Sequence, residues 1–105
     1  VTGKPAVKSA KVSRQGTKRK VTVKFTVPKA CDGTDWVLAK KVSQSEDGSY
    51  TYVSGYAYTK KNQTKTTVIF KNVKPGVYYL TGRAYVKGYA KNYTKWSEVK
   101  KVVVK

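Results

Sequence analysis

Hydrophobic and polar residues alternate with a period of two along most of this chain, and no stretch shows convincing helical periodicity. The clearest segment covers residues 20–27, and Pro28 ends it because proline cannot donate to a strand ladder. Lysine and threonine fill the other face of this segment. Its apolar face consists of Val21, Val23, Phe25 and Val27. The pattern predicts a β-strand with one buried face.

Turn residues divide the chain into seven such segments. Asp47-Gly48 is a hairpin-turn signal between two of them, and Trp36 and Leu38 share the apolar face of the segment before it. The predicted strands cover residues 6–13, 20–27, 36–42, 49–59, 66–70, 78–86 and 96–104. Alternation breaks in the first and last of these, where we expect bulges or edge strands that switch sheets. This spacing predicts an all-β sandwich.

A Pro-Gly turn at Pro75-Gly76 leads into the strand at 78–86, which carries the most informative pattern of the chain. A tyrosine just after such a turn can bury its ring and bond its hydroxyl to the backbone of the corner. Either Tyr78 or Tyr79 is placed for this role. The alternation favours Tyr78, because it shares a face with Leu80, Gly82 and Ala84.

These residues resemble the signature of fibronectin type III domains: Val73, Pro75-Gly76, a tyrosine, then alternating apolar positions that end in Arg83-Ala84. The resemblance covers nearly the whole chain, from Pro5 to Val104. It implies a seven-stranded Greek-key β-sandwich, fibronectin type III or immunoglobulin-like, with residues 1–105 forming a single domain.

The lysine-rich style of the sequence looks like modules found in secreted multidomain proteins of Gram-positive bacteria. The resemblance therefore implies an extracellular or cell-surface location and neighbouring domains of the same polypeptide as partners. Because the chain has neither an initiating Met nor a signal peptide, we expect it to be a segment of a longer protein.

Composition argues against catalysis. The chain has no His, so the usual serine and cysteine triads and imidazole metal ligands are excluded. Its single cysteine, Cys31, is expected to be a small buried side chain or an incidental thiol. Asp32 and Asp35 make only a poor calcium motif. We expect no enzyme activity, no cofactor and no metal, and, since no apolar run approaches about 20 residues, no membrane insertion. A monomer is expected.

The formal charge is +18, from 23 Lys and Arg against 5 acidic residues. Such a domain attracts polyanions, and the candidates are anionic cell-wall polymers or polysaccharide. Nucleic acid would bind only non-specifically, through salt-dependent phosphate contacts. The alternative is that the lysines keep exposed strand edges soluble.

Tyrosines form two clusters. In a regular strand Tyr50, Tyr52, Tyr56 and Tyr58 share one side, although Gly55 is placed to bulge the strand and split them. The second cluster surrounds the loop before the last strand, and we take it as the candidate ligand site: Tyr85, Lys87, Tyr89, Lys91, Tyr93, Lys95 and Trp96. Flat rings stack on sugar faces or bases, but tyrosine also packs well between strands.

The sequence therefore favours a non-catalytic spacer or presentation module with electrostatic affinity for anionic envelope polymers. The alternative is a dedicated glycan- or anionic-polymer-binding module that uses the loop aromatics and lysines. An accessory domain of a polysaccharide-degrading enzyme is a third hypothesis.

Overall fold

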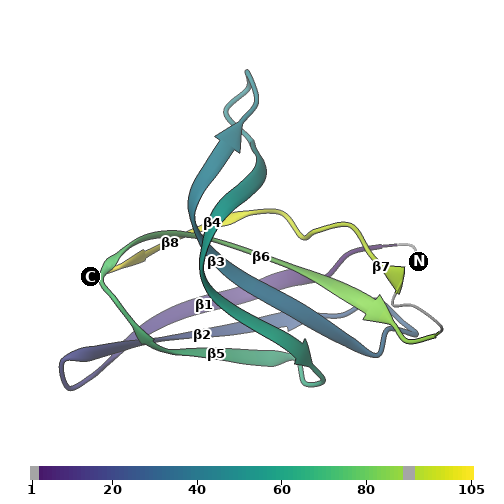
Figure 1. Ribbon diagram of the computed structural model, residues 1–105, viewed down its shortest axis with the longest axis horizontal. Coiled ribbons are helices and arrows are strands. Elements are labelled where there is room, and N and C mark those ends of the chain that lie inside the picture. Colours follow the sequence, from purple (N-terminus) through teal and green to yellow (C-terminus); the bar gives the residue numbers. More distant parts are fainter. Residues whose placement is uncertain (1–2, 89–91) are drawn as a thin grey trace.

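The computed structural model of the chain describes residues 3–88 and 92–105. Two antiparallel sheets pack against each other around one hydrophobic core (Figure 1). Sheet A has the strand order β1-β2-β5, and sheet B has the order β4-β3-β6-β7, with β8 also paired to β6. The strands are β1 (Ala6–Gln15), β2 (Lys18–Thr26), β3 (Gly33–Gln44), β4 (Tyr50–Gln63), β5 (Thr67–Val73), β6 (Gly76–Val86), β7 (Asn92–Tyr93) and β8 (Lys100–Val104). The predicted all-β sandwich architecture is confirmed.

Sheet A follows the alternation of its sequence. Val21, Val23 and Phe25 of β2 are buried, and the residues between them face away from the core. The register between β1 and β2 shifts between Val7 and Ser9, so one residue of β1 is extra. This β-bulge explains the break in alternation that the sequence shows in the first strand.

Sheet B contains a long hairpin, β3–β4, whose tip projects from the body of the domain (Figure 1). The tip is the predicted Asp-Gly turn: Gly48 has φ +88°, and Asp47 accepts a hydrogen bond from the Ser49 backbone N–H at 3.0 Å. Hydrogen bonds from the Ser45 and Ser49 hydroxyls, followed by that backbone bond, lower the pKa of Asp47 from 3.8 to about 2. The turn therefore favours an ionised Asp47.

The two sheets meet at aromatic rings. Phe25 of sheet A lies 4.5 Å, centroid to centroid, from Trp36 of sheet B, and both are buried. The Trp36 indole N–H donates to Thr34 Oγ1 at 3.0 Å, so its polar atom is satisfied inside the core. Gly82 of β6 lies directly against the indole, and a Cβ at this position would overlap the ring. The core thus depends on a glycine as well as on large side chains.

The tyrosine corner is present at Tyr78. Its ring is buried, and its hydroxyl donates to the Lys74 carbonyl oxygen at 2.7 Å, across the Pro-Gly turn. The Tyr58 ring packs edge-on against it at 5.7 Å, and the Tyr58 hydroxyl accepts from the Lys74 N–H at 2.9 Å. Burial first, then the neighbouring Tyr58 hydroxyl, raises the pKa of Tyr78 from 10.0 to about 12. The prediction that Tyr78 rather than Tyr79 forms the corner is confirmed.

The C-terminal part differs from the prediction. The last strand begins at Lys100 rather than at residue 96, and a short additional strand, β7, precedes it, so the described residues form eight strands where seven were expected. The expected irregularity in the last strand is also wrong. β8 pairs with β6 over Gly76–Leu80 in continuous register, and Val103 is simply an exposed valine, at 47% of its full accessibility, between buried Val102 and Val104.

Both faces of sheet B are buried in its centre. Trp36, Leu38 and Leu80 face sheet A, while Val37, Ala39 and Thr81 face the other way and are also buried. Alternation distinguishes the two faces but does not show that the second one is covered. Within residues 3–88 and 92–105, no helix is long and apolar enough to cross a membrane.

Candidate functional site

Residues 94–99 form an irregular strip along β6 and fix the position of Trp96. On one side of Trp96, the Thr94 N–H donates to the Ala84 carbonyl at 2.9 Å and Thr94 Oγ1 accepts from the Ala84 N–H at 3.0 Å. On the other side, the Ser97 N–H donates to the Gly82 carbonyl at 2.6 Å, and Ser97 Oγ accepts from the Gly82 N–H at 3.0 Å. Side-chain hydroxyls thus replace part of a β-ladder and hold the backbone on both sides of Trp96.

Arg83 lies between two aromatic rings. Its guanidinium carbon is 3.7 Å from the centroid of the Tyr93 ring and 4.7 Å from that of the Trp96 ring. Asp35 approaches Arg83 Nε at 4.0 Å, and the other carboxylate oxygen of Asp35 accepts from the Asn62 N–H at 2.9 Å. Because cation–π contacts between partly buried groups are favourable, Arg83 orients both rings.

The predicted loop site is only partly brought together. Tyr85 is buried, with 1% of its surface accessible, so its ring cannot stack on a ligand. Burial, and then the negative charges of Asp35 and Asp32, raise the pKa of Tyr85. The sequence pattern counted Tyr85 as a loop aromatic, but it lies on the outer face of β6, and the ring of Tyr93 packs edge-on against it at 6.3 Å.

The other predicted residues have different surroundings. Tyr93 and Trp96 expose 39% and 36% of their surface, and Lys87 and Lys95 are exposed. The remaining two, Tyr89 and Lys91, lie outside the described residues. Trp96 therefore keeps the exposure that a binding role requires, and Tyr93 shares its ring face with Arg83.

The tyrosines of β4 do not form one stripe. Leu38 pairs with Tyr58 and Ala39 with Tyr56, so β4 has one residue more than β3 at this point, close to Gly55 with its φ of +67°. This bulge turns Tyr58 toward the core and Tyr56 toward the outer face. The structure therefore shows the second alternative, in which a bulge near Gly55 splits the tyrosine stripe.

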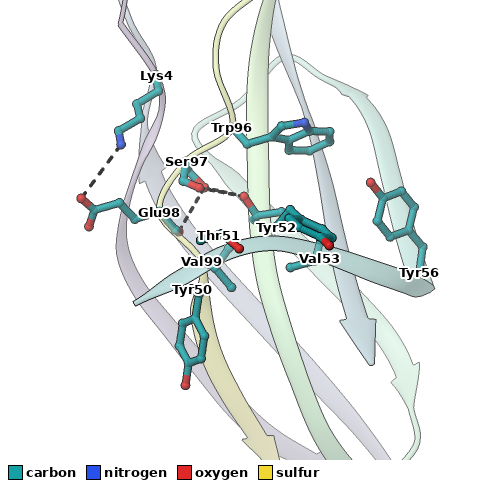
Figure 2. Close-up of a pocket in the computed structure, with 11 residues that line it drawn as sticks. Lys4, Tyr50, Thr51, Tyr52, Val53, Tyr56, Trp96, Ser97, Glu98 and Val99 are labelled. Atoms are coloured by element: carbon teal, nitrogen blue, oxygen red, sulfur yellow. Dashed lines mark hydrogen bonds and ion pairs between the residues drawn. The ribbon is translucent and has the colours of Figure 1, made fainter. Parts of the chain in front are cut away.

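The split brings part of the first tyrosine cluster next to part of the second. Figure 2 shows the rings of Tyr52, Tyr56 and Trp96 around one hollow, with Tyr50 and the Lys4–Glu98 pair at its margin. Its volume is about 280 Å³, and Tyr52 and Tyr56 expose 66% and 54% of their surface. We call this hollow the aromatic groove; the residues that line it are Lys4, Tyr50, Thr51, Tyr52, Val53, Tyr56, Thr81, Trp96, Ser97, Glu98 and Val99.

The sequence pattern places the two clusters in separate segments of the chain. It missed Ser97 and Thr81, which support the groove from beneath: Thr81 Oγ1 donates to the Ser97 carbonyl at 2.9 Å. A Thr or Ser at an outward strand position ordinarily faces solvent, so the sequence gives no signal that Thr81 and Ser97 support a groove. The signal for Tyr52 was present, because it alternates with other tyrosines.

The acidic residues near the N-terminal end of β3 bind backbone groups. Asp32 accepts from the Lys87 N–H at 2.7 Å, as Asp35 does from Asn62. In the described part of the chain, His, Cys, Asp and Glu side chains form no group of three or more that would hold a metal ion. Cys31 is a free, half-buried thiol.

The comparisons with known proteins add no family. No protein-family model matches the chain, and no curated protein matches its sequence.

Proposed function

We propose that this chain is a fibronectin type III-like module of a secreted or cell-surface bacterial protein. Its role is non-catalytic: it spaces or presents neighbouring domains and binds anionic polymers of the cell envelope through charge. Strand order supports the family part of this proposal. After the β3–β4 hairpin of sheet B, β5 returns to sheet A beside β2, a connection of the Greek-key kind. The corner at Tyr78 is a further feature of such sandwiches.

The observation that carries the electrostatic part is the composition of sheet A. Its three strands contain eight Lys and Arg residues and no Asp or Glu. The cationic residues are Lys8, Lys11, Arg14, Lys18, Arg19, Lys20, Lys24 and Lys71. One whole sheet of the sandwich is therefore without the acidic partners that usually balance surface lysines.

Part of this charge lies on one face. Lys20 and Lys24 alternate with the buried residues of β2, and Lys11 pairs with Thr22 between them. All three therefore lie on the outer side of sheet A, which we call the lysine face. Lysine suits diffuse attraction to a flexible polyanion, since its ammonium group is a mobile point charge. Such attraction weakens steeply with salt.

Binding to Gram-positive cell walls, with and without teichoic acid, tests this proposal. Walls with teichoic acid should bind the domain at low ionic strength and release it as salt rises toward about 1 M, where the Debye length is about 3 Å. Removal of teichoic acid should abolish most of the binding.

A matched pair of variants separates the lysine face from net charge alone. The triple substitution Lys11→Glu, Lys20→Glu and Lys24→Glu changes the lysine face. The triple substitution Lys60→Glu, Lys61→Glu and Lys65→Glu changes the net charge equally, at exposed positions at the end of β4 and in the turn that follows it. The first variant should lose much more wall binding than the second. Equal losses, or no wall binding at low salt, would contradict the proposal.

A further inference from the structure

The aromatic groove lies on the outer face of sheet B, across the sandwich from the lysine face. Its exposed rings have no role in the core, because sheet A packs against the opposite side of sheet B. Three large aromatic side chains that line one hollow and keep a third to two thirds of their surface accessible are unusual on a solvent-facing sheet. These exposed rings suit a ligand that has flat apolar faces.

Trp96 is fixed before any ligand arrives. The strip at 94–99 is bonded to β6 on both sides of the indole, and Arg83 covers one face of the ring at 4.7 Å. Trp96 also lines the groove and keeps 36% of its surface accessible, so part of the ring remains free for a ligand. A side chain held in this way loses little conformational freedom on binding, which favours affinity.

A lysine-lined groove adjoins the aromatic one. The two hollows share Lys4, Glu98 and Val99, and the second, about 640 Å³, continues past Lys100 and Lys101 at the start of β8. Its lining contains three lysines and one acidic residue, so the lining carries a net positive charge. Lys100 and Lys101 are consecutive in β8, and their side chains point to opposite faces of the sheet. An extended ligand would therefore meet aromatic rings first and positive charges next to them.

We propose that these adjoining grooves bind an acidic polysaccharide, a polymer of pyranose units that carry carboxylate or phosphate groups. The C–H face of a pyranose stacks on Trp96 and Tyr52, in the way that flat rings stack on aromatic side chains. The aromatic groove, at about 280 Å³, lies at the small end of ligand pockets and holds one or two sugar units rather than a larger ligand. Acidic groups of the following units pair with the lysines that line the second groove, with Lys100 on the sheet A side of β8 and Lys101 on the outer side.

This site does not rest on the lysine face. The aromatic groove lies on the outer face of sheet B, the second groove lies between β8 and the start of β1, and ring stacking acts as well as charge. The two therefore predict different ligands. The lysine face binds any polyanion. The grooves bind one that also has sugar rings, and should retain part of their affinity when salt screens the charges.

Three polymers test the proposal on the whole chain: polygalacturonate has sugar rings and carboxylates, inorganic polyphosphate has charge without rings, and dextran has rings without charge. We expect polygalacturonate to bind most tightly and to remain bound at a salt concentration that releases polyphosphate. Trp96→Ala and Tyr52→Ala should each weaken polygalacturonate binding about tenfold and leave polyphosphate binding unchanged. Val77→Ala, at an exposed position of β6 outside both grooves, is the control and should have no effect.

A separate variant tests the second, lysine-lined groove. Lys100→Gln with Lys101→Gln should weaken polygalacturonate binding more than Lys60→Gln with Lys61→Gln, which removes the same charge elsewhere. The triple Glu variant of the lysine face should lose polyphosphate but keep the salt-resistant binding of polygalacturonate, so failure of one proposal does not imply failure of the other.

Two results would overturn the inference. One is unchanged polygalacturonate affinity in Tyr52→Ala, a variant whose parent side chain is mostly exposed and whose folding is therefore safe even if Trp96→Ala unfolds. The other is dextran binding as tight as that of polygalacturonate, which would make the site one for neutral sugars.

Discussion

The two outer faces of this sandwich differ in sequence and in surroundings, because β2 alternates whereas residues 36–39 of β3 are all apolar. On sheet A the outward positions hold Lys20, Thr22 and Lys24, which are partly or fully exposed. On sheet B the outward positions at the centre hold Val37, Ala39 and Thr81, which are buried. The difference arises because the strip at 94–99 bonds along β6 and the β4 tyrosines lie beside it.

The two faces therefore differ in how they can bind a ligand. An uncovered face filled with lysine acts through its charge, which is diffuse and sensitive to salt. On the covered face, small buried residues pack beneath the strip at 94–99, and this strip positions the Trp96 ring. In this domain the second arrangement produces the better defined geometry, because hydrogen bonds to β6 and Thr81 hold the strip at 94–99, whereas the lysine face consists of long, mobile side chains.

The sharpest test places the same charge on both faces. Val37→Lys would bury an ammonium group on the covered face and should lower the free energy of unfolding by about 3 kcal/mol. Thr22→Lys, at the equivalent middle strand of sheet A, should change it by less than about 0.5 kcal/mol. Urea denaturation of the two variants measures the difference. Equal effects would mean that the face of sheet B is not covered in solution.

The next test removes one support of the covering strip. Ser97→Ala deletes the hydroxyl that accepts from the Gly82 N–H, which leaves a buried donor unpaired and should cost about 2 kcal/mol. Ser13→Ala, at an exposed position of β1, should stay within about 0.5 kcal/mol of the parent. Thermal unfolding of both distinguishes a bonded strip from a loosely attached one, for which the two variants would behave alike.

A smaller loss of stability is expected from a substitution in the core between the two sheets. Tyr78→Phe removes the hydrogen bond to the Lys74 carbonyl and should cost about 1 kcal/mol at neutral pH. Because the folded state raises the pKa of Tyr78 from 10.0 to about 12, the Tyr78 contribution is fully present below pH 10.0 and is lost as pH rises to about 12. The stabilities of the parent and of Tyr78→Phe should therefore converge over this interval in urea titrations, and a constant difference would contradict the assigned pKa.

The smallest effect is expected at the exposed tip of the β3–β4 hairpin. The folded state lowers the pKa of Asp47 from 3.8 to about 2, so the stability that ionised Asp47 contributes is present above pH 3.8 and is lost as pH falls to about 2. Asp47→Asn should remove this part of the acid dependence, whereas the neighbouring substitution Glu46→Gln should not. A carboxyl titration by NMR gives the Asp47 pKa directly, and an ordinary value near 3.8 would refute the turn contacts.

Much of the fold was predictable because its signals are local. The Asp47-Gly48 turn and the corner at Tyr78 depend on residues within a few positions of one another, and the sequence identified both. Each predicted strand overlaps an observed one, although their bounds differ by up to four residues. The main difference is at the C-terminal end, where Ser97 and Thr94 substitute hydroxyl bonds for a regular ladder. Composition alone does not distinguish such a strip from a strand.

The candidate site was predictable only in part. The sequence makes Trp96 and Tyr85 candidates without showing whether either ring is exposed. In the structure Trp96 is exposed, whereas Tyr85 is buried because its outward strand position is covered by neighbours that are distant in sequence. Tyr52 and Tyr56 were noted only as members of a stripe. Their position near Trp96 depends on a bulge in β4 and on the path of the strip along β6, neither of which strand periodicity describes.

The sequence by itself determined the strands outside the C-terminal part, the corner, the inner face of each sheet and the excess of positive charge. Each of these follows from residues close together in the chain or from a simple count. Only the tertiary structure decided that the outer face of sheet A stays open while that of sheet B is covered, and that Trp96 meets Tyr52 and Tyr56. The physical reason is that burial of an outward face depends on which distant segment bonds across it, and here the Ser97 and Thr94 hydroxyls bring that segment to β6.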